Sequence, residues 1–321
     1  MKIIPIFLPY AGCKRKCVFC DQIKATGQKK VPSFSDIAQT IAEYSKTSQE
    51  YEIGFYGGTF TGLSEEMMEK YLRFVRKFPV VKSIRVSTRP DEVNEQKLMI
   101  LKRYGVETIE IGVQSFVDEI LDASKRGYTA KEAEKTCKLI KKYGFTLSVH
   151  LMVGLPRSKK EHEILSALRT VECGADLVRI HPTLVFEGTE LHEMMDRGEY
   201  SPLDLREAVD VCSDLVSILE GWGIKVIRVG YYVPVELRKH VIGGPFDPSL
   251  GDKVRKAVIT KIVERMKPRR IVAPKRYFSW FDKEIARTRI ETGETIYFDD
   301  LSYTDALFHI GKEVVEKCLN N

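Results

Sequence analysis

Short apolar runs alternate along most of the chain with longer stretches in which apolar residues recur at helical spacing. The short runs are rich in Ile, Val, Phe and Tyr, which is typical of buried strands. They predict strands at residues 2–8, 51–56, 83–87, 107–112, 146–152, 176–181 and 225–229. The longer stretches predict helices at residues 35–45, 65–77, 94–104, 130–143, 159–172 and 201–220.

Strands that alternate with helices in this way indicate βαβ units and a parallel sheet. The pattern contains six such units, fewer than a closed eight-stranded barrel needs. We therefore expect an α/β fold, a partial and open (β/α)6 TIM-like barrel over residues 1–230. From residue 231 the pattern changes, and Gly, Pro and aromatic residues become frequent. We expect residues 231–321 to form a small α/β C-terminal domain.

The predicted helix starts carry recognisable capping residues. Two sequences match the capping box, in which Ser or Thr precedes Glu by three positions, namely Thr129 to Glu132 and Ser158 to Glu161. A Ser followed by Pro is typical of a helix that begins at the Pro. This pattern predicts that Ser201 caps a helix starting at Pro202.

The composition narrows the class of protein. A chain of 321 residues with 43% hydrophobic and 30% charged residues fits a soluble globular protein. No apolar run is long enough to span a bilayer, and the run at residues 3–8 is too short for a signal-peptide core. The seven cysteines are an odd number, which argues against a secreted disulfide framework. We expect a cytoplasmic protein with no membrane partner.

One segment is much more basic than the rest. The net charge of the chain is +6, but residues 252–276 contain ten Lys and Arg residues against Asp252 and Glu264. Such an excess fits a polyanionic partner such as RNA. A solvated helix face is the alternative, and the sequence leaves both open.

Three cysteines follow the first strand with the spacing C-x3-C-x2-C: Cys13, Cys17 and Cys20. Three thiolates can hold three irons of a [4Fe–4S] cluster and leave the fourth iron open to a ligand, whereas most electron-transfer cubanes use four cysteines. Structural zinc needs four ligands, and the loop contains no His and no fourth Cys. A distant fourth cysteine remains an alternative, although the other four lie in apolar-periodic stretches typical of core positions: Cys137, Cys173, Cys212 and Cys318.

This motif resembles that of the radical S-adenosylmethionine (SAM) superfamily. The resemblance implies that the open iron chelates SAM and that an injected electron cleaves it to a 5′-deoxyadenosyl radical. It implies that Gly57, Gly58 and Thr59, after the second strand, contact the methionyl amine of SAM. It further implies that Phe19 lies near the adenine.

Polar residues at the ends of later strands complete the predicted SAM site. Ser87, Gln114 and His150 lie at or just after the ends of the third, fourth and fifth strands, and they are expected to point into the same rim. Gln114 can bond polar groups of SAM through its amide, and Arg126 can pair with a carboxylate. A capping Gln and a surface Arg are the alternatives. The sequence identifies no further catalytic residue.

Several longer segments resemble one particular group within this superfamily. They are similar to the radical SAM part of the Elongator catalytic subunit and its bacterial relatives. These segments are residues 87–91, 110–115, 152–156, 179–185, 188–191, 198–203, 243–246 and 296–298. The Elongator subunit also carries an acetyltransferase domain, and we expect none in this chain. Oxygen-independent coproporphyrinogen III oxidases are similar in the barrel, where their Gln and Arg correspond to Gln114 and Arg126. Those oxidases have carboxylates on their third and fifth strands, where this chain has Ser87 and His150. This difference weakens the interpretation of the chain as an oxidase of the porphyrin type.

These observations predict a radical SAM enzyme that abstracts a hydrogen atom from its substrate. The resemblance and the basic segment favour RNA, in particular tRNA. The basic residues Lys14, Arg15 and Lys16 inside the cysteine loop fit either a polyanionic substrate or an acidic electron donor such as ferredoxin or flavodoxin. A small-molecule oxidase or decarboxylase of the porphyrin type is the alternative among enzymes. A non-catalytic regulator that binds an Fe–S cluster or SAM is the alternative of a different class.

Overall fold

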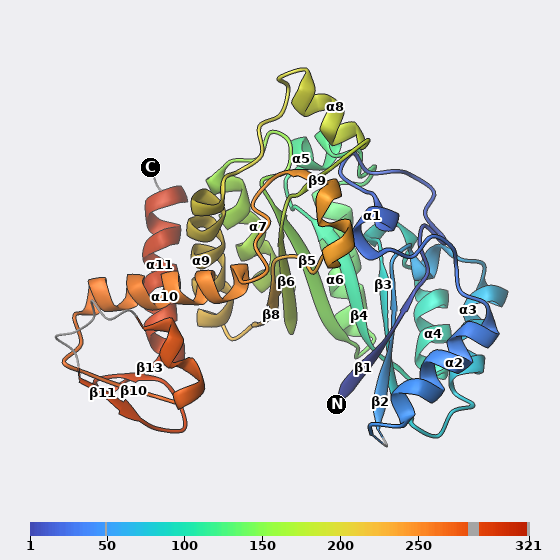
Figure 1. Cartoon of the computed structure of the whole chain (residues 1–321), viewed down its shortest axis with the longest axis horizontal. Coiled ribbons are helices and arrows are strands. Elements are labelled where there is room, and N and C mark those ends of the chain that lie inside the picture. The colour runs from blue at the N-terminus through green and yellow to red at the C-terminus, as the bar shows by residue number, and fades with distance from the viewer. Residues whose placement is uncertain (49, 282–288, 320–321) are drawn as a thin grey trace.

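A computed structural model describes residues 1–48, 50–281 and 289–319. Its central element is a parallel seven-stranded sheet that curls into a half-barrel (Figure 1). The strands follow one another across the sheet in chain order: β1 (Lys2–Phe7), β2 (Tyr51–Tyr56), β3 (Val81–Thr88), β4 (Val106–Gln114), β5 (Thr146–Val153), β6 (Leu177–Pro182) and β8 (Lys225–Val229). The edge strands β1 and β8 do not pair with each other, so the barrel is open on one side. The predicted fold class is confirmed.

Helices cover the outer face of the sheet and connect successive strands (Figure 1). They are α2 (Phe34–Ser45), α3 (Glu65–Val75), α4 (Glu95–Arg103), α6 (Ala130–Lys142), α7 (Lys160–Glu172) and α9 (Leu205–Gly221). Three shorter helices that the periodicity did not indicate lie near the carboxyl ends of the strands, at the top of Figure 1: α1 (Gln22–Thr26), α5 (Asp118–Ala123) and α8 (Glu190–Asp196). The longer connections of the barrel therefore lie at the carboxyl ends of its strands.

The core lies between the sheet and these helices. Ile53, Ile84, Ile109 and Val149, from four neighbouring strands, are fully buried. Burying one such side chain stabilises the fold by about 1.5–3 kcal/mol, so the central strands form a rigid base. Cys137, Cys173 and Cys212 are buried as predicted, whereas Cys318 is half-buried.

The chain after β8 extends this core. The helices α10 (Leu250–Met266) and α11 (Tyr303–Leu319) pack against α9, and Trp222 contacts Phe308 with ring centroids 4.8 Å apart. Between them lies a small sheet of β10 (Arg270–Ala273), β11 (Arg289–Thr292), β12 (Tyr297–Phe298) and β13 (Leu301–Ser302). A further pair joins β7 (Val185–Phe186) to β9 (Val241–Gly243). The predicted division at residue 231 stays a prediction, since the apolar core of α10 and α11 is continuous with that of the barrel.

Two of the three predicted helix caps are wrong. The capping box of Thr129 and Glu132 is present at the start of α6. By contrast, α9 begins at Leu205 and not at Pro202, because Asp204 and Glu207 form a complete capping box. The Asp204 carboxylate accepts a hydrogen bond from the Glu207 N–H at 2.7 Å, and the Glu207 carboxylate accepts one from the Asp204 N–H at 2.9 Å. Two satisfied donors outweigh the preference of a Pro for the first helical position.

The third cap fails because Ser158 bonds elsewhere. Helix α7 begins at Lys160, and the Ser158 hydroxyl donates instead to the buried carboxylate of Glu163. The same carboxylate accepts a hydrogen bond from the Gly154 N–H at 2.8 Å, so it ties together the loop between β5 and α7. Burial raises the pKa of Glu163 to about 7, although these two hydrogen bonds oppose the shift.

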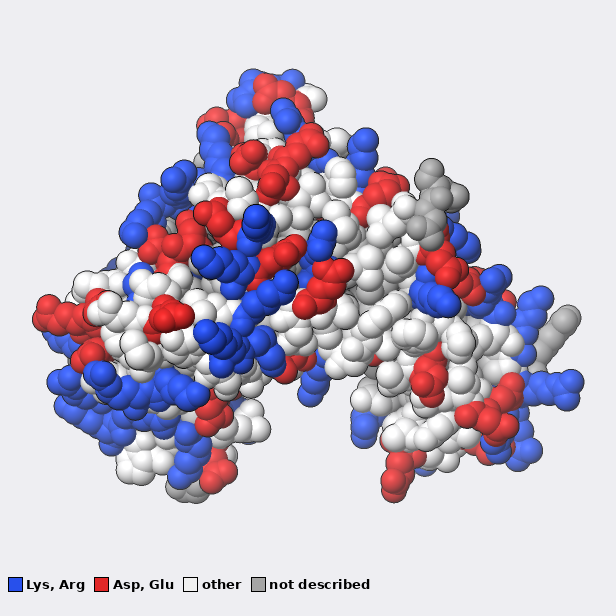
Figure 2. All heavy atoms as spheres, turned by 180° about the vertical axis from the view of Figure 1, so that it is seen from behind, with Lys and Arg blue, Asp and Glu red and all other residues white. Residues whose placement is uncertain are grey.

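Basic side chains gather on the rear of the molecule, over the end that carries α3 and α4 (lower left in Figure 2). The last turns of α3, α4 and α6 contain basic residues, among them Arg73, Lys102 and Lys141. Cations at helix C-termini interact favourably with the helix dipole, which accounts for this placement. Across the described ranges, no helix is both long and apolar enough to span a bilayer.

The buried Glu163 predicts a pH dependence of stability. Its pKa is raised in the folded state, so its contribution is fully present below the unfolded value and is lost as pH rises through about 7. Glu163→Gln should remove this loss and make the protein more stable than wild type at pH 8, by about 3 kcal/mol. Urea unfolding of both proteins between pH 4.5 and 8 measures the difference. A constant difference across that range would contradict the prediction.

Candidate functional site

A pocket of about 300 Å³ opens at the carboxyl ends of the strands. Every residue that the sequence singled out for the cluster or for SAM lines this one pocket: Cys13, Cys17, Phe19, Cys20, Gly57, Gly58, Thr59, Ser87, Gln114, Arg126 and His150. They come from the loops after β1 and β2, from β3, β4 and β5, and from the segment between α5 and α6. The parallel sheet brings them together because all its strands end at the same edge. Their individual roles stay predictions.

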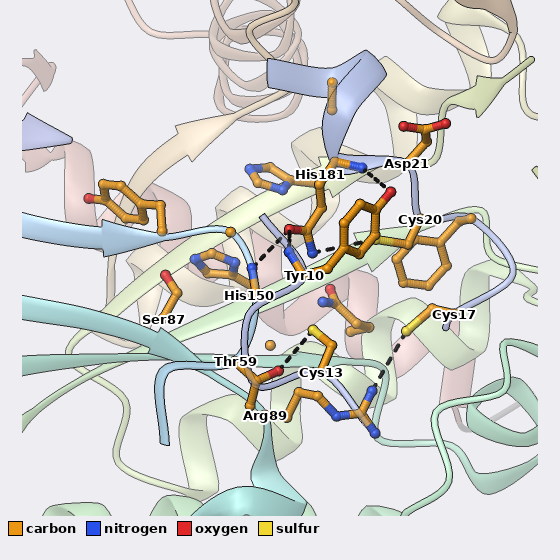
Figure 3. Close-up of a pocket in the computed structure, with 18 of the residues that line it drawn as sticks. Tyr10, Cys13, Cys17, Cys20, Asp21, Thr59, Ser87, Arg89, His150 and His181 are labelled. Carbon is orange, nitrogen blue, oxygen red and sulfur yellow. Dashed lines mark hydrogen bonds between the residues drawn. The ribbon is translucent and has the colours of Figure 1, made fainter. Parts of the chain in front are cut away.

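The three cysteines occupy the loop after β1, and each sulfur has a polar neighbour (Figure 3). Cys13 Sγ lies 3.3 Å from Thr59 Oγ1. Cys17 is buried, and its Sγ accepts a hydrogen bond from Arg126 Nη1 at 2.9 Å. Cys20 Sγ lies 3.8 Å from Gln22 Nε2. The loop therefore holds the three thiols in fixed surroundings on one side of the pocket.

Gln22, which no sequence pattern indicated, fixes the shape of this loop. Its Oε1 accepts hydrogen bonds from the backbone N–H of Tyr10 at 2.7 Å and of Gly58 at 2.9 Å. Its own backbone N–H donates to the Tyr10 hydroxyl at 3.0 Å. One amide group thus ties the cysteine loop to the loop after β2. A Gln two residues after the last cysteine belongs to no spacing pattern that would have revealed this role.

The glycines of the two loops allow them to touch. Gly58 has a φ of +30°, and a Cβ placed on it would lie 2.3 Å from the Ala11 carbonyl oxygen. Gly12 has a φ of +72°, and its Cβ would lie 2.2 Å from the Thr59 carbonyl oxygen. Only glycine tolerates both the backbone conformation and the close approach. The approach that the structure shows is between two protein loops, and contact of Gly57, Gly58 and Thr59 with SAM stays a prediction.

Two buried arginines face the sulfur of Cys17. Besides Arg126, Arg89 Nη1 lies 3.7 Å from Cys17 Sγ (Figure 3). The Nη2 of Arg89 pairs with Asp91 at 2.9 Å. Burial would lower the pKa of Arg126, but Tyr128 and Cys17 raise it above its ordinary value, so the guanidinium stays charged. Arg126 lies against a thiol, and its expected pairing with a carboxylate stays a prediction. Arg89 was missed, although it lies in a segment noted for its resemblance.

Positive charge near the three sulfurs would stabilise them as thiolates. Burial, together with the neighbouring Cys17 and Cys13 sulfurs, raises the pKa of the Cys20 thiol to about 12. Arg126 acts in the opposite direction. Three thiolates so near one another repel, and cations at the sulfurs relieve that repulsion. The donor set therefore suits a positively charged iron cluster.

Two polar atoms in the pocket wall lack partners. Within the described ranges, the buried Ser87 Oγ and Gln114 Oε1 make no hydrogen bond, although buried polar atoms are almost always bonded. Gln114 also has a φ of +71°, in a part of β4 where the register with β5 shifts. Strained backbone and unpaired polar atoms of this kind concentrate at ligand sites. They fit a polar ligand such as SAM.

No three His, Cys, Asp or Glu side chains in the described part of the chain converge closely enough to hold a single metal ion. A cubane cluster makes a different demand, because each thiolate binds its own iron. Three separated sulfurs around one pocket are compatible with it. The residues present therefore fit both the [4Fe–4S] cluster and SAM.

A buried charge network lies beneath the pocket. Glu110, which is fully buried, accepts hydrogen bonds from Arg85 at 2.8 Å and from Arg179 at 2.8 Å. His150 Nε2 lies 2.8 Å from the same carboxylate, and Tyr56 donates to it at 3.3 Å. Burial would raise the pKa of Glu110, but His150 and Arg179 hold it well below its ordinary range. One nitrogen of His150 is thus occupied by Glu110, a partner that the sequence did not reveal.

Two further aromatic residues continue the wall. The ring of His181 lies 5.5 Å from that of His150 and 4.4 Å from that of Tyr231, measured between centroids. Burial, with His150 and Arg179 nearby, lowers the pKa of His181 well below its ordinary value. His181 is therefore neutral at pH 7.

Comparison with protein families gives two matches. The radical SAM superfamily matches residues 7–168, and the radical SAM C-terminal domain matches residues 175–290. The first match covers the cysteine loop and all strands from β2 to β5.

The similar proteins include tRNA uridine(34) acetyltransferases and Elongator complex proteins. The tRNA uridine(34) acetyltransferase of Methanocaldococcus jannaschii is 34% identical over 174 residues, which are 53% of this chain and 31% of that protein. Elongator complex protein 3 of Mus musculus is 28% identical over 62% of this chain and 40% of its own length. The solved structure of Elp3 from Methanocaldococcus infernus has a TM-score of 0.64 and 25% identity, over 81% of this chain and 63% of that one. The chain thus spans about a third of the acetyltransferase.

The contact between the two loops predicts a specific sensitivity at Gly58. Gly58→Ala should place a methyl group against the Ala11 carbonyl, displace the cysteine loop and cost about 1–3 kcal/mol beyond the strain of a positive φ. Gly174→Ala is the matched control, because Gly174 has a φ of +69° and open space around it. Urea unfolding and iron content after anaerobic reconstitution measure both variants. Equal losses in the two would show that the loop contact is unimportant.

Proposed function

Because the chain belongs to the radical SAM superfamily, whose enzymes use a [4Fe–4S] cluster and SAM, we propose that it is a radical SAM enzyme of tRNA modification. The observation that carries this proposal is the convergence of three thiols and two unpaired polar atoms on one pocket. Cys13, Cys17 and Cys20 would hold the cluster. When bound, the cluster and SAM supply a 5′-deoxyadenosyl radical that abstracts a hydrogen atom from the substrate.

The side chains around the pocket have distinct tasks in this proposal. Ser87 Oγ and Gln114 Oε1 are the atoms that would hydrogen-bond polar groups of SAM. Arg126 and Arg89 stabilise the charge of Cys17 at the buried end of the cysteine loop. Phe19 offers an apolar surface to the adenine. His150, held by Glu110, would contact the ribose from the floor of the pocket.

The relatives support tRNA as the substrate. The matched part of the M. jannaschii protein belongs to a tRNA uridine(34) acetyltransferase, and 34% identity over 174 residues covers half of this chain. We propose that this chain acts on a tRNA uridine through hydrogen abstraction. This proposed activity covers the radical step and no acyl transfer.

The basic segment contributes less to RNA binding than its sequence indicated. Its charges are partly neutralised by carboxylates from other elements. Arg255 pairs with Glu220 at 2.6 Å, Lys261 with Asp214 at 2.6 Å, and Arg265 with Glu313 at 2.7 Å. Further ion pairs join Lys253 to Asp247, Lys261 to Asp210 and Arg270 to Asp300. Much of the segment therefore stabilises the packing of α10 on its neighbours.

The cysteine loop itself presents a basic surface. Lys14, Arg15 and Lys16 are exposed beside the cysteines, and Lys14 pairs with Glu92 at 2.9 Å. We propose that an acidic reductant protein, such as ferredoxin or flavodoxin, docks here to deliver the electron. The short path from this surface to the sulfurs supports that placement.

The cluster assignment predicts how cysteine variants behave. Replacing Cys13, Cys17 or Cys20 with Ala should abolish or degrade the cluster, because each thiolate binds a different iron. Cys318→Ala is the control, since Cys318 is half-buried and far along the chain on α11. Iron content and 5′-deoxyadenosine formation after anaerobic reconstitution are the measurements. Loss of iron in the control variant would argue for a fourth cysteine ligand.

The substrate assignment predicts salt-dependent binding of tRNA. Contacts to phosphates release counterions, so the affinity of the reconstituted protein for unmodified tRNA should fall by about tenfold or more between 50 and 200 mM salt. Filter binding with tRNA and with a DNA duplex of similar length measures affinity and selectivity. A protein with no affinity for tRNA at low salt would rule out the RNA assignment and favour a small-molecule substrate.

A further inference from the structure

A second cavity, of about 500 Å³, lies on the open side of the half-barrel. It is bounded by inward-facing residues of the edge strand β1, namely Ile3, Pro5 and Phe7, and by Arg228 of the other edge strand, β8. The segment just after β8 closes its end with Tyr231 and Tyr232. Because β1 and β8 do not pair, this cavity occupies the gap through which the barrel interior is reached.

The cavity adjoins the pocket at the strand ends, and the two share part of their walls. Both are lined by Phe7, Tyr56, His150, His181 and Tyr231. A molecule that enters between β1 and β8 therefore reaches the space beside the cysteines and the unpaired Ser87 and Gln114. The cavity is thus placed to hold the part of the substrate next to the reacting atom.

The charges of the cavity are uniformly positive. Among the described residues that line it, none is acidic, whereas Arg179 and Arg228 are both basic. Arg179 is compensated from behind by the buried carboxylate of Glu110 at 2.8 Å. Arg228 forms no ion pair or hydrogen bond within the described part of the chain. Its guanidinium is therefore the uncompensated cation at the mouth of the cavity.

Aromatic rings accompany this charge. Tyr232 lines the same cavity as Arg228 and is 68% exposed, so its ring is accessible to a ligand. Deeper in the cavity, Tyr231 packs on His181, which is neutral. An uncompensated arginine next to an exposed ring matches an anionic ligand with a planar group.

We infer that this cavity binds a nucleotide of the RNA substrate, with Arg228 contacting a backbone phosphate and Tyr232 stacking on a base. The inference rests on the proposed function, because it assigns the part of the site that receives tRNA. The planar fork of Arg228 can donate two hydrogen bonds to phosphate oxygens. The arrangement selects single-stranded RNA, since a base must leave its helix to stack on a protein ring.

Binding titrations with the full reconstituted chain and unmodified tRNA test this inference. Arg228→Gln should weaken binding by roughly tenfold and reduce the slope of log affinity against log salt by about 0.7 to 0.9, because one phosphate contact is lost. Tyr232→Leu should weaken binding by roughly tenfold with an unchanged slope, because stacking releases no counterion. Lys225→Gln is the matched control, as it removes the same charge from the exposed opposite end of β8. Melting temperatures confirm that each variant is folded.

The outcomes separate this inference from the proposed function. If wild type binds tRNA and the Arg228 and Tyr232 variants bind it equally well with the same slope, the nucleotide site is wrong and the tRNA assignment stands. If wild type does not bind tRNA, the substrate assignment itself fails. If wild type instead binds coproporphyrin III and Arg228→Gln loses that binding, the arginine serves a carboxylate and the nucleotide assignment is overturned.

Discussion

The site depends on one amide oxygen. Gln22 Oε1 accepts hydrogen bonds from the backbone of Tyr10 in the cysteine loop and of Gly58 in the loop after β2. Without this shared acceptor, two partly buried N–H groups would lose their partner, at a cost of about 1 kcal/mol for each. The loops also have no room to move closer together, because Gly12 and Gly58 each lie against the backbone of the opposite loop. The positions of the three sulfurs therefore follow from one side chain and two glycines.

Charge is arranged in layers around this anchored loop. Exposed lysines and an arginine lie on its outer side, and the guanidiniums of Arg126 and Arg89 lie against the buried Cys17. Below the pocket, the ionised Glu110 fixes Arg85 and Arg179 in the barrel interior. Breaking such a buried network by removing one partner is strongly destabilising, since it leaves an uncompensated charge. The network thus keeps the floor of the pocket rigid while its rim retains unpaired atoms for a ligand.

The two cavities have different linings and suit different ligands. The one at the strand ends holds thiols and unpaired polar atoms, which suit a cluster and SAM. The one between β1 and β8 is cationic and aromatic, which suits part of a substrate. This division follows from a barrel that stops at seven strands, because closing it would fill the gap between the edge strands. The open side gives access that a complete barrel would deny.

The sequence by itself determined the order of the main strands and helices, the cysteine motif and a set of residues that the structure brings together in one pocket. These features are local: hydrophobic periodicity marks each element, and parallel strands bring their ends to one edge whatever their packing. Only the tertiary structure decided which charges meet. It placed Arg126 on a thiol, gave His150 to Glu110, and neutralised Arg255 with Glu220. Such pairs join residues far apart in the chain, and neither spacing nor composition records the distance between two side chains in the folded protein.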